Sequence, residues 1–242
     1  MKKTLTVQDL LDTGAHFGHP TSKWNPNFLP YIATKKNGIH IINLEETIRC
    51  IKKADKEILN IANSGGTILF VGTKNQVKDV VQESADACGM FYIVERWLGG
   101  ILTNFSTIKK SIRRLEKLEK ESSSIYKNLT KKEMMMLERE RIKLSDLHRG
   151  IKDMKYIPNA IFVVDLKLEK IAVDEAKILG IPIFGIVDTN TNPKLADYPI
   201  PANDDSIKTV KLILNYFIES INSANMSKKE DESVKKESNK EQ

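Results

Sequence analysis

The sequence predicts an α/β fold with a doubly wound, mostly parallel sheet. Short apolar runs alternate with segments whose apolar residues recur at helical spacing, a rhythm typical of repeated strand–helix–strand units. In contrast, residues 106–155 contain no strand-like run. We therefore expect an α/β core formed by residues 1–105 and 156–224, an inserted helical hairpin over residues 106–155, and a disordered charged tail over residues 225–242.

The N-terminal segment begins with a short helix over residues 7–13. Thr6 can cap this helix and Gly14 can end it. Residues 15–38 contain three prolines and show little periodicity, so we expect a loop-rich arm on the surface.

From Ile39 onward, we expect five strands and four helices. The clearest strand is the apolar run from Thr67 to Val71, because a continuous apolar run is typical of a strand buried on both faces of a parallel sheet. The helices are marked by apolar residues three and four positions apart. The predicted strands are 39–44, 67–71, 91–94, 160–164 and 183–187, and the predicted helices are 48–62, 77–85, 171–179 and 206–221.

The segment 106–155 has the pattern of two helices joined by a weak helical stretch at Ser122–Ser124. Each helix has a narrow apolar stripe, which suits two helices packed mainly on each other. We therefore predict a protruding antiparallel coiled coil. Its stripes are formed by Ile108, Ile112 and Leu115, and by Leu137, Leu144, Leu147, Ile151 and Met154.

The positive charge of the chain is concentrated in this hairpin. The whole sequence has 38 Lys and Arg against 32 Asp and Glu, whereas residues 106–155 alone have 15 against 8. A localised basic element is expected of a protein that docks on phosphates. A solvated helical face explains the charge equally well, so charge alone does not decide between the two.

Composition argues against a membrane or secreted protein. No apolar run approaches the roughly 18–20 residues that span a bilayer, and residues 1–14 have no apolar core of a signal peptide. The two cysteines, Cys50 and Cys88, have no pairing motif and are expected as small buried residues in a reducing compartment. We predict a cytoplasmic location.

Two groups of residues could support enzyme chemistry. The turn Gly72–Asn75 follows a strand and opens a helix, where phosphate can bind, but it lacks the glycine-rich phosphate-binding motifs. Asp165 and Asp188 each end a strand, and a metal or catalytic cluster could form if folding brought His16 or His19 together with Asp188 and with Asp204 or Asp205.

A structural interpretation of this second group is favoured over a catalytic one. Asp204 or Asp205 can cap the last helix, and the histidines can form local hydrogen bonds. The sequence has no recognisable catalytic motif. We therefore predict no enzyme activity, cofactor or metal, although a structural ion held by His16 or His19 with the aspartates stays open.

Basic residues next to aromatic ones indicate RNA binding more directly. Lys and Arg neutralise phosphates, and exposed aromatic rings stack on bases. Lys109 and Lys110 each repel an Arg four residues later, and a polyanion partner would explain why this repulsion is tolerated. Trp97 is more plausible as a core anchor. The predicted RNA-binding residues are Lys23, Trp24, Lys35, Lys36, Arg96, Lys109, Lys110, Arg113 and Arg114.

Several long strings resemble the bacterial type of the small-subunit ribosomal protein S2 family. They occur in the family's order and cover about residues 5–221, and they include GAHFGHPTSKWNP (14–26), NGIHIINLEET (37–47), ILFVGTKNQ (68–76), ERWLGGILTNF (95–105), PNAIFVVD (158–165) and GIPIFGIVDTNTNP (180–193). The chain departs from the family's common residues at Lys36, Asn75 and Val94. Lys36 keeps the charge of the usual Arg but loses bidentate recognition.

This resemblance implies a flavodoxin-like sheet with an inserted coiled-coil hairpin. It implies a structural constituent of the small ribosomal subunit, on its solvent side near the head–body junction, without catalytic activity. It also implies contact with small-subunit ribosomal RNA and neighbouring proteins, and a role in recruiting ribosomal protein S1.

Overall fold

The core of the protein is a five-stranded parallel sheet. The computed structural model describes residues 5–120 and 129–238, with side chains up to Met226. The strands lie in the order β5-β4-β6-β7-β8, and all four neighbouring pairs are parallel. Their bounds are Ile68–Val71 (β4), Phe91–Ile93 (β5), Ala160–Val164 (β6), Ile183–Val187 (β7) and Tyr198–Pro201 (β8). Numbered along the chain, this is the 2-1-3-4-5 order of flavodoxin-like folds.

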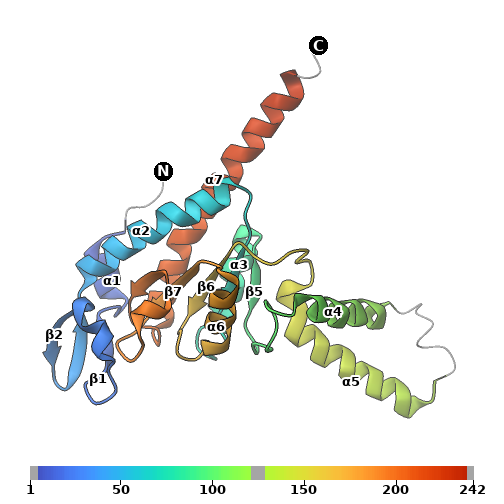
Figure 1. Cartoon of the computed structure of the whole chain (residues 1–242), viewed down its shortest axis with the longest axis horizontal. Coiled ribbons are helices and arrows are strands. Elements are labelled where there is room, and N and C mark those ends of the chain that lie inside the picture. Colours follow the sequence, from blue (N-terminus) through green and yellow to red (C-terminus); the bar gives the residue numbers. More distant parts are fainter. Residues whose placement is uncertain (1–4, 121–128, 239–242) are drawn as a thin grey trace.

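Helices cover both faces of the sheet, as the prediction of a doubly wound fold requires (Figure 1). One face packs against α2 (Leu44–Asn63), α3 (Lys78–Cys88) and α7 (Ile207–Ser238). The other face packs against α6 (Lys170–Leu179). Neighbouring residues of a strand therefore enter different cores: Phe70 points toward α7 and Leu69 toward the opposite layer.

The predicted strand count of the parallel sheet was correct, but the set of strands was partly wrong. Residues 39–44 do not join this sheet, and its fifth strand is β8, which lies in a segment expected to be a proline-rich loop. Pro199 and Pro201 are tolerated because β8 is an edge strand, where a missing backbone donor leaves no partner unsatisfied. The short helix η4 (Pro193–Leu195) precedes it.

The N-terminal arm is more regular than predicted. After α1 (Val7–Asp12), it forms an antiparallel sheet of order β1-β3-β2, with strands Phe17–Pro20, Ile32–Lys36 and Ile39–Ile42, and the helix η1 (Pro26–Tyr31). Asn37 and Gly38 connect β2 to β3 with φ angles of 49° and 74°. Asn-Gly with positive φ at both positions is a strong hairpin signal, and the sequence prediction overlooked it.

Two helices occupy most of the segment inserted between β5 and β6. They are α4 (Phe105–Glu119) and α5 (Lys131–His148), followed by η3 (Arg149–Ile151), and they project beyond the β5 edge of the sheet (Figure 1). The predicted connection at Ser122–Ser124 lies outside the described residues. Ile151 and Met154 were assigned to the hairpin seam, but they are buried in the α6-side core of the α/β unit.

The last helix is longer than predicted. α7 continues past Ile221 to Ser238 and extends away from the sheet (Figure 1), whereas we expected its end at Ile221 and a disordered tail. The tail is rich in Lys and Glu and has no Gly or Pro, so nothing in its composition opposes helix propagation. Within the described residues, no helix is both long and apolar enough to cross a membrane.

Gly150 provides a test of how the inserted helices join the core. A β-carbon at this position would overlap the backbone oxygen and the ring of Tyr92. We therefore expect Gly150→Ala to lower the free energy of unfolding by about 1–3 kcal/mol, measured by urea denaturation. Gly99→Ala is the matched control, because a β-carbon there has no heavy atom within 4 Å. Equal stability of the two variants would contradict this packing.

Candidate functional site

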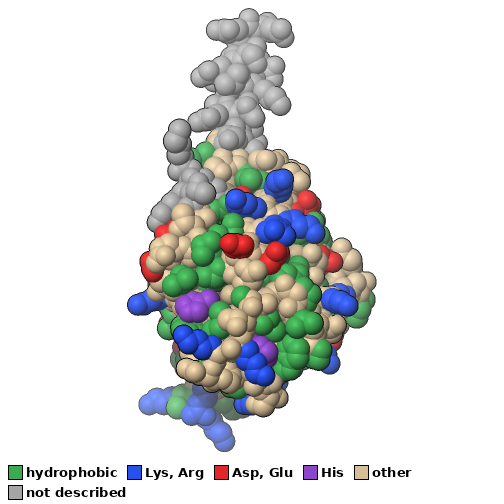
Figure 2. Space-filling view, turned by 90° about the vertical axis from the view of Figure 1, so that its left-hand side faces the viewer, with side chains coloured by type: hydrophobic (Ala, Val, Ile, Leu, Met, Phe, Trp, Pro, Cys, Tyr) green, Lys and Arg blue, Asp and Glu red, His purple; other side chains and the backbone are tan. Residues whose placement is uncertain are grey.

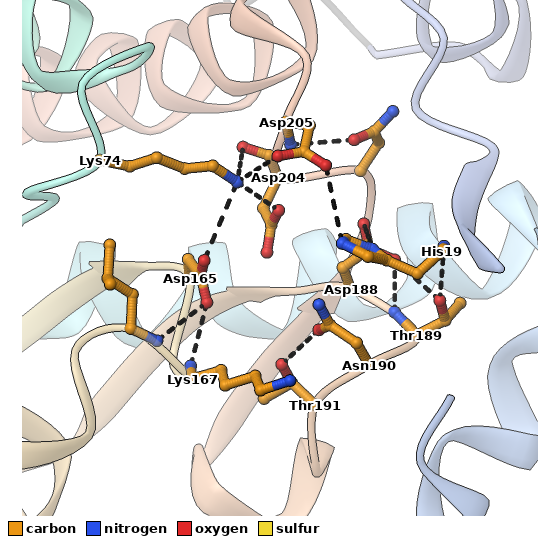
Figure 3. Close-up of polar contacts among 12 residues, drawn as sticks. His19, Lys74, Asp165, Lys167, Asp188, Thr189, Asn190, Thr191, Asp204 and Asp205 are labelled. Atoms are coloured by element: carbon orange, nitrogen blue, oxygen red, sulfur yellow. Dashed lines mark hydrogen bonds and ion pairs between the residues drawn. The ribbon is translucent and has the colours of Figure 1, made fainter. Parts of the chain in front are cut away.

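Charged residues converge at the carboxyl ends of four parallel strands, where α/β folds commonly place their sites. Lys74 follows β4, Asp165 follows β6, and Asp204 and Asp205 follow β8 (Figure 3). The Lys74 Nζ lies 2.9 Å from Asp204 Oδ1, 2.5 Å from Asp205 Oδ1 and 3.8 Å from Asp165 Oδ2. The ammonium group is thus the counter-ion of three carboxylates.

His19 brings the N-terminal arm into this cluster. Its Nδ1 lies 2.9 Å from Asp188 Oδ2, and its Nε2 lies 3.7 Å from Asp205 Oδ2. The backbone N–H of His19 donates to Thr189 Oγ1 at 2.8 Å, and the N–H of Asn25 donates to the Thr189 carbonyl at 2.7 Å. These contacts join β1 and the following loop to the end of β7 (Figure 3).

The structure corrects both parts of the structural interpretation of these residues. Neither aspartate caps α7; the Ser206 hydroxyl accepts the hydrogen bond from Thr209 N, at 3.3 Å. His19 bonds to distant residues instead of local ones. His16 is not part of the cluster, and its buried Nδ1 has no partner among the described residues.

Burial determines the electrostatics of the cluster. Asp204 is 1% exposed, and its burial, reinforced by the charges of Asp165 and Asp188, raises its pKa to about 7 despite the opposing effect of Lys74. The hydrogen bond to Asp188 raises the pKa of His19. Burial disfavours the charge of Lys74, but hydrogen bonds to Asp205 and Asp204 outweigh it and raise the pKa of Lys74. Lys74 therefore carries its positive charge at neutral pH.

One part of the cluster has the atoms of a cation site. One ligand atom each from His19, Asp188 and Asp205 lies within 4.8 Å of the others, and a nitrogen with two carboxylate oxygens suits a divalent ion such as Zn²⁺. Lys74 already neutralises Asp205 from its other side. The geometry thus accommodates an ion but does not require one for charge balance.

The turn after β4 is already occupied by protein groups. Thr73 N donates to Glu169 Oε1 at 2.7 Å, and Glu169 is 3% exposed. A carboxylate therefore lies against the amide that a nucleotide phosphate would need, while Lys74 is held by aspartates. A phosphate at this turn would have to displace these protein contacts.

A second buried carboxylate organises the loop of residues 95–104. Glu175, on α6, accepts hydrogen bonds from Trp97 Nε1 at 3.1 Å, Gly100 N at 2.7 Å, Leu102 N at 3.0 Å, and Thr103 N and Oγ1 at 3.1 and 3.0 Å. Burial alone would raise its pKa, but these donors lower it. Trp97 is 6% exposed, so its prediction as a core anchor is confirmed. Glu175 was not among the predicted site residues, although it is an acidic residue within an apolar helical stripe.

The four predicted RNA-binding residues of α4 fall into two pairs. Lys110 and Arg113 are exposed. Arg114 instead forms a two-bonded ion pair with Glu140 of α5, at 3.0 Å for both bonds, and Lys109 donates to the Lys155 carbonyl. These internal contacts partly offset the predicted charge repulsion along α4. The repulsion alone therefore does not require a polyanion partner.

The remaining predicted residues are not brought together with those of α4. Lys23, Lys35 and Lys36 are exposed, and Trp24 is half-buried with its ring 4.9 Å from that of His40. They belong to the N-terminal arm, at the opposite end of the molecule from α4 (Figure 1). On that end, Lys and Arg side chains are scattered among apolar and polar ones (Figure 2). Arg96 is exposed, just after β5 and toward the α4 end.

Comparison with known proteins places this geometry in a family. The model of the family described as ribosomal protein S2 matches residues 10–224. The chain belongs to the ribosomal protein S2 family. A "Small ribosomal subunit protein uS2" of Onion yellows phytoplasma is 54% identical over 211 residues, which cover 87% of this chain and 78% of that protein. The protein of the same description from Fusobacterium nucleatum is 48% identical over 219 residues, covering 90% and 89%.

The raised pKa of Asp204 predicts a specific pH dependence. The folded protein keeps this proton up to about pH 7, whereas the unfolded chain releases it near the ordinary pKa of aspartate. The free energy of unfolding therefore decreases as the pH rises from the unfolded-state pKa to the folded-state pKa. Asp204→Asn lacks this titration. We expect its stability relative to wild type to increase between pH 4.5 and pH 8, by about one to a few kcal/mol.

Chemical denaturation at several pH values measures this difference. Asp174→Asn is the control, because it makes the same side-chain change at an exposed position of α6, outside the buried cluster, and the change seen for Asp204→Asn should exceed that of this control. A relative stability of Asp204→Asn that decreases with rising pH would show instead that Lys74 keeps Asp204 ionised.

Proposed function

We propose that this protein is a structural component of the small ribosomal subunit, binds ribosomal RNA and acts in the cytoplasm without catalysing a reaction. The observation that carries the proposal is the family match over residues 10–224. It is supported by two relatives that are described as small ribosomal subunit proteins and align over most of this chain. Lys74 is paired with Asp204 and Asp205, and Glu169 accepts a hydrogen bond from Thr73 N, which supports a structural rather than a catalytic role for the strand ends.

The inserted helices form the main RNA-binding element in this proposal. We infer that α4 and α5 form an antiparallel coiled-coil hairpin. The Arg114–Glu140 ion pair and the 2.8 Å contact of Ser111 Oγ with His148 Nε2 support it, because both join the two helices. The exposed cations Lys110 and Arg113 then face solvent along the hairpin, with Arg96 near its base.

The N-terminal arm supplies a second contact region at the other end of the molecule. Lys23, Lys35 and Lys36 are exposed there, and Trp24 exposes part of its ring. Since the two groups are far apart, we propose that they contact different segments of the ribosomal RNA. The family resemblance extends the proposal to neighbouring small-subunit proteins and to the recruitment of ribosomal protein S1.

A charge-reversal pair on the hairpin tests the RNA-binding role. Lys110→Glu/Arg113→Glu reverses two exposed cations that have no ion pair with residues 5–120 or 129–226, so the fold should persist. We expect binding to small-subunit ribosomal RNA to weaken at least tenfold, and the slope of log affinity against log salt to fall by about one to two, since each lost phosphate contact contributes about 0.9.

Filter binding across a salt series and co-sedimentation with small subunits provide the measurements. Lys52→Glu/Lys56→Glu is the matched control, because it makes the same charge change at exposed positions of α2. Normal affinity and co-sedimentation of the α4 variant would remove this surface from the interface. Equal weakening by both variants would show that only net charge matters.

A further inference from the structure

A groove beside the base of the inserted helices has features that the general proposal of RNA binding does not use. It lies between α4 and the segment 152–156 and has a volume of about 410 Å³, within the roughly 300–1,000 Å³ of small-ligand pockets. Its lining combines several cations, two carboxylates, two apolar side chains and a tyrosine: Lys109, Ile112, Arg113, Glu116, Lys152, Asp153, Met154, Lys155 and Tyr156.

Tyr156 is the most unusual member of this groove. Its side chain is 79% exposed, although most large apolar side chains of the core are almost fully buried. The ring stands beside the cation Lys109, whose Nζ is 5.6 Å from the ring centroid. An aromatic ring that protein does not cover is available for stacking with a planar ligand.

Lys109 holds the tyrosine segment against α4. Its Nζ donates to the carbonyl of Lys155 and lies 4.9 Å from the centroid of the Phe105 ring. Phe105 is itself buried in the core of the α/β unit. Lys109 therefore attaches the segment of the exposed ring to the base of α4. This attachment reduces the conformational entropy that is lost when a ligand binds.

The charges of the groove favour an anion. Four of its residues are cationic and two are acidic, and one of the cations, Lys152, is already paired with Glu119 at 2.5 Å. Arg113 has no hydrogen bond or ion pair to another side chain among the contacts described for residues 5–120 and 129–226. Arg113 and Lys155 are thus the groups best placed to take a phosphate.

The two acidic residues argue for a nucleotide over a bare phosphate. Glu116 and Asp153 would repel a phosphate, but a carboxylate accepts hydrogen bonds from the amino groups of bases. A ring for stacking, cations for phosphate and acceptors for a base edge match the three parts of one nucleotide. In a duplex the base is stacked and paired, so only an unpaired nucleotide can offer its face to Tyr156.

We propose that this groove binds a single unpaired RNA nucleotide, with its base stacked on Tyr156 and its phosphate held by Arg113 and Lys155. The proposal rests on the proposed function of RNA binding and assigns to this surface a preference for single-stranded over double-stranded RNA. The exposed part of α4 then contacts the RNA backbone, while the groove holds one extruded base.

Tyr156→Ala in the full-length protein tests the proposal, with fluorescence anisotropy on three labelled probes of equal length. The probes are a single-stranded oligoadenylate, a blunt RNA duplex and an abasic ribose-phosphate strand. We expect Tyr156→Ala to weaken binding of the oligoadenylate about tenfold, since stacking of a base on an aromatic ring contributes an effect of this size to the binding of single strands. Binding of the duplex and the abasic strand should be unchanged.

Two further variants separate stacking from other effects. Tyr156→Phe keeps the ring and should bind all three probes like wild type, whereas Ile178→Ala removes a 75% exposed side chain of α6 and should change nothing. Wild-type affinity of Tyr156→Ala for the oligoadenylate, or equal weakening for all three probes, would overturn the proposal.

Failure of this proposal is distinguishable from failure of the proposed function. If Tyr156→Ala binds the oligoadenylate normally while wild type still co-sediments with small subunits in a salt-dependent manner, only the nucleotide groove is wrong. If wild type binds neither small subunits nor any of the three probes, RNA binding itself is refuted.

Discussion

The buried carboxylate of Glu175 is the interaction on which the attachment of the inserted helices depends. It accepts five hydrogen bonds from residues 97–103, and these residues lead from the β5 edge directly into α4. Without Glu175, the amides of Gly100, Leu102 and Thr103 would lose this acceptor, and the buried amide of Leu102 would be left unsatisfied at a cost of about 1–3 kcal/mol. One acidic side chain of α6 thus fixes both the position of Trp97 and the start of the basic helix.

The cluster at the strand ends has a corresponding role for the N-terminal arm. Lys74 connects the ends of β4, β6 and β8, and His19 with Thr189 connects the arm to β7. These residues lie at the crevice where flavodoxin-like folds usually bind a ligand. In this protein charged side chains at these strand ends pair with one another.

The sequence predicted the parts of the fold that depend on local pattern and not those that depend on topology. β4 was predicted from its continuous apolar run and α2 from its periodic apolar stripe, because burial imposes a regular sequence pattern on both elements. β8 was overlooked because its prolines resemble a loop, although an edge strand tolerates them. Asn37-Gly38 is a local hairpin signal that was not used. The strand at residues 39–44 was therefore assigned to the parallel sheet instead of to the hairpin with β2.

The candidate site was predictable only as a set of residues. His19 is separated from Asp188 and Asp205 by most of the chain, so their convergence follows from the strand order, which the sequence pattern does not specify. Glu175 and Glu169 were not recognised for a related reason. A buried carboxylate is stabilised by donors on another segment, and its own helix gives no sign of where those donors are.

The basic residues of α4 show why a count of charges overstates an RNA-binding surface. Arg114 forms an ion pair with Glu140. Lys109 donates a hydrogen bond to the Lys155 carbonyl and lies beside the ring of Tyr156. These two residues position the surface, whereas Lys110 and Arg113 remain available to a polyanion. A cation that is already in an ion pair has to give up that pair to contact a phosphate, so the net gain in binding free energy is small. An exposed cation loses no partner when it contacts the RNA and releases counter-ions. In the proposed RNA interface, the affinity contributed by α4 therefore depends on the exposed cations Lys110 and Arg113, while Lys109 and Arg114 hold neighbouring segments of the protein against α4.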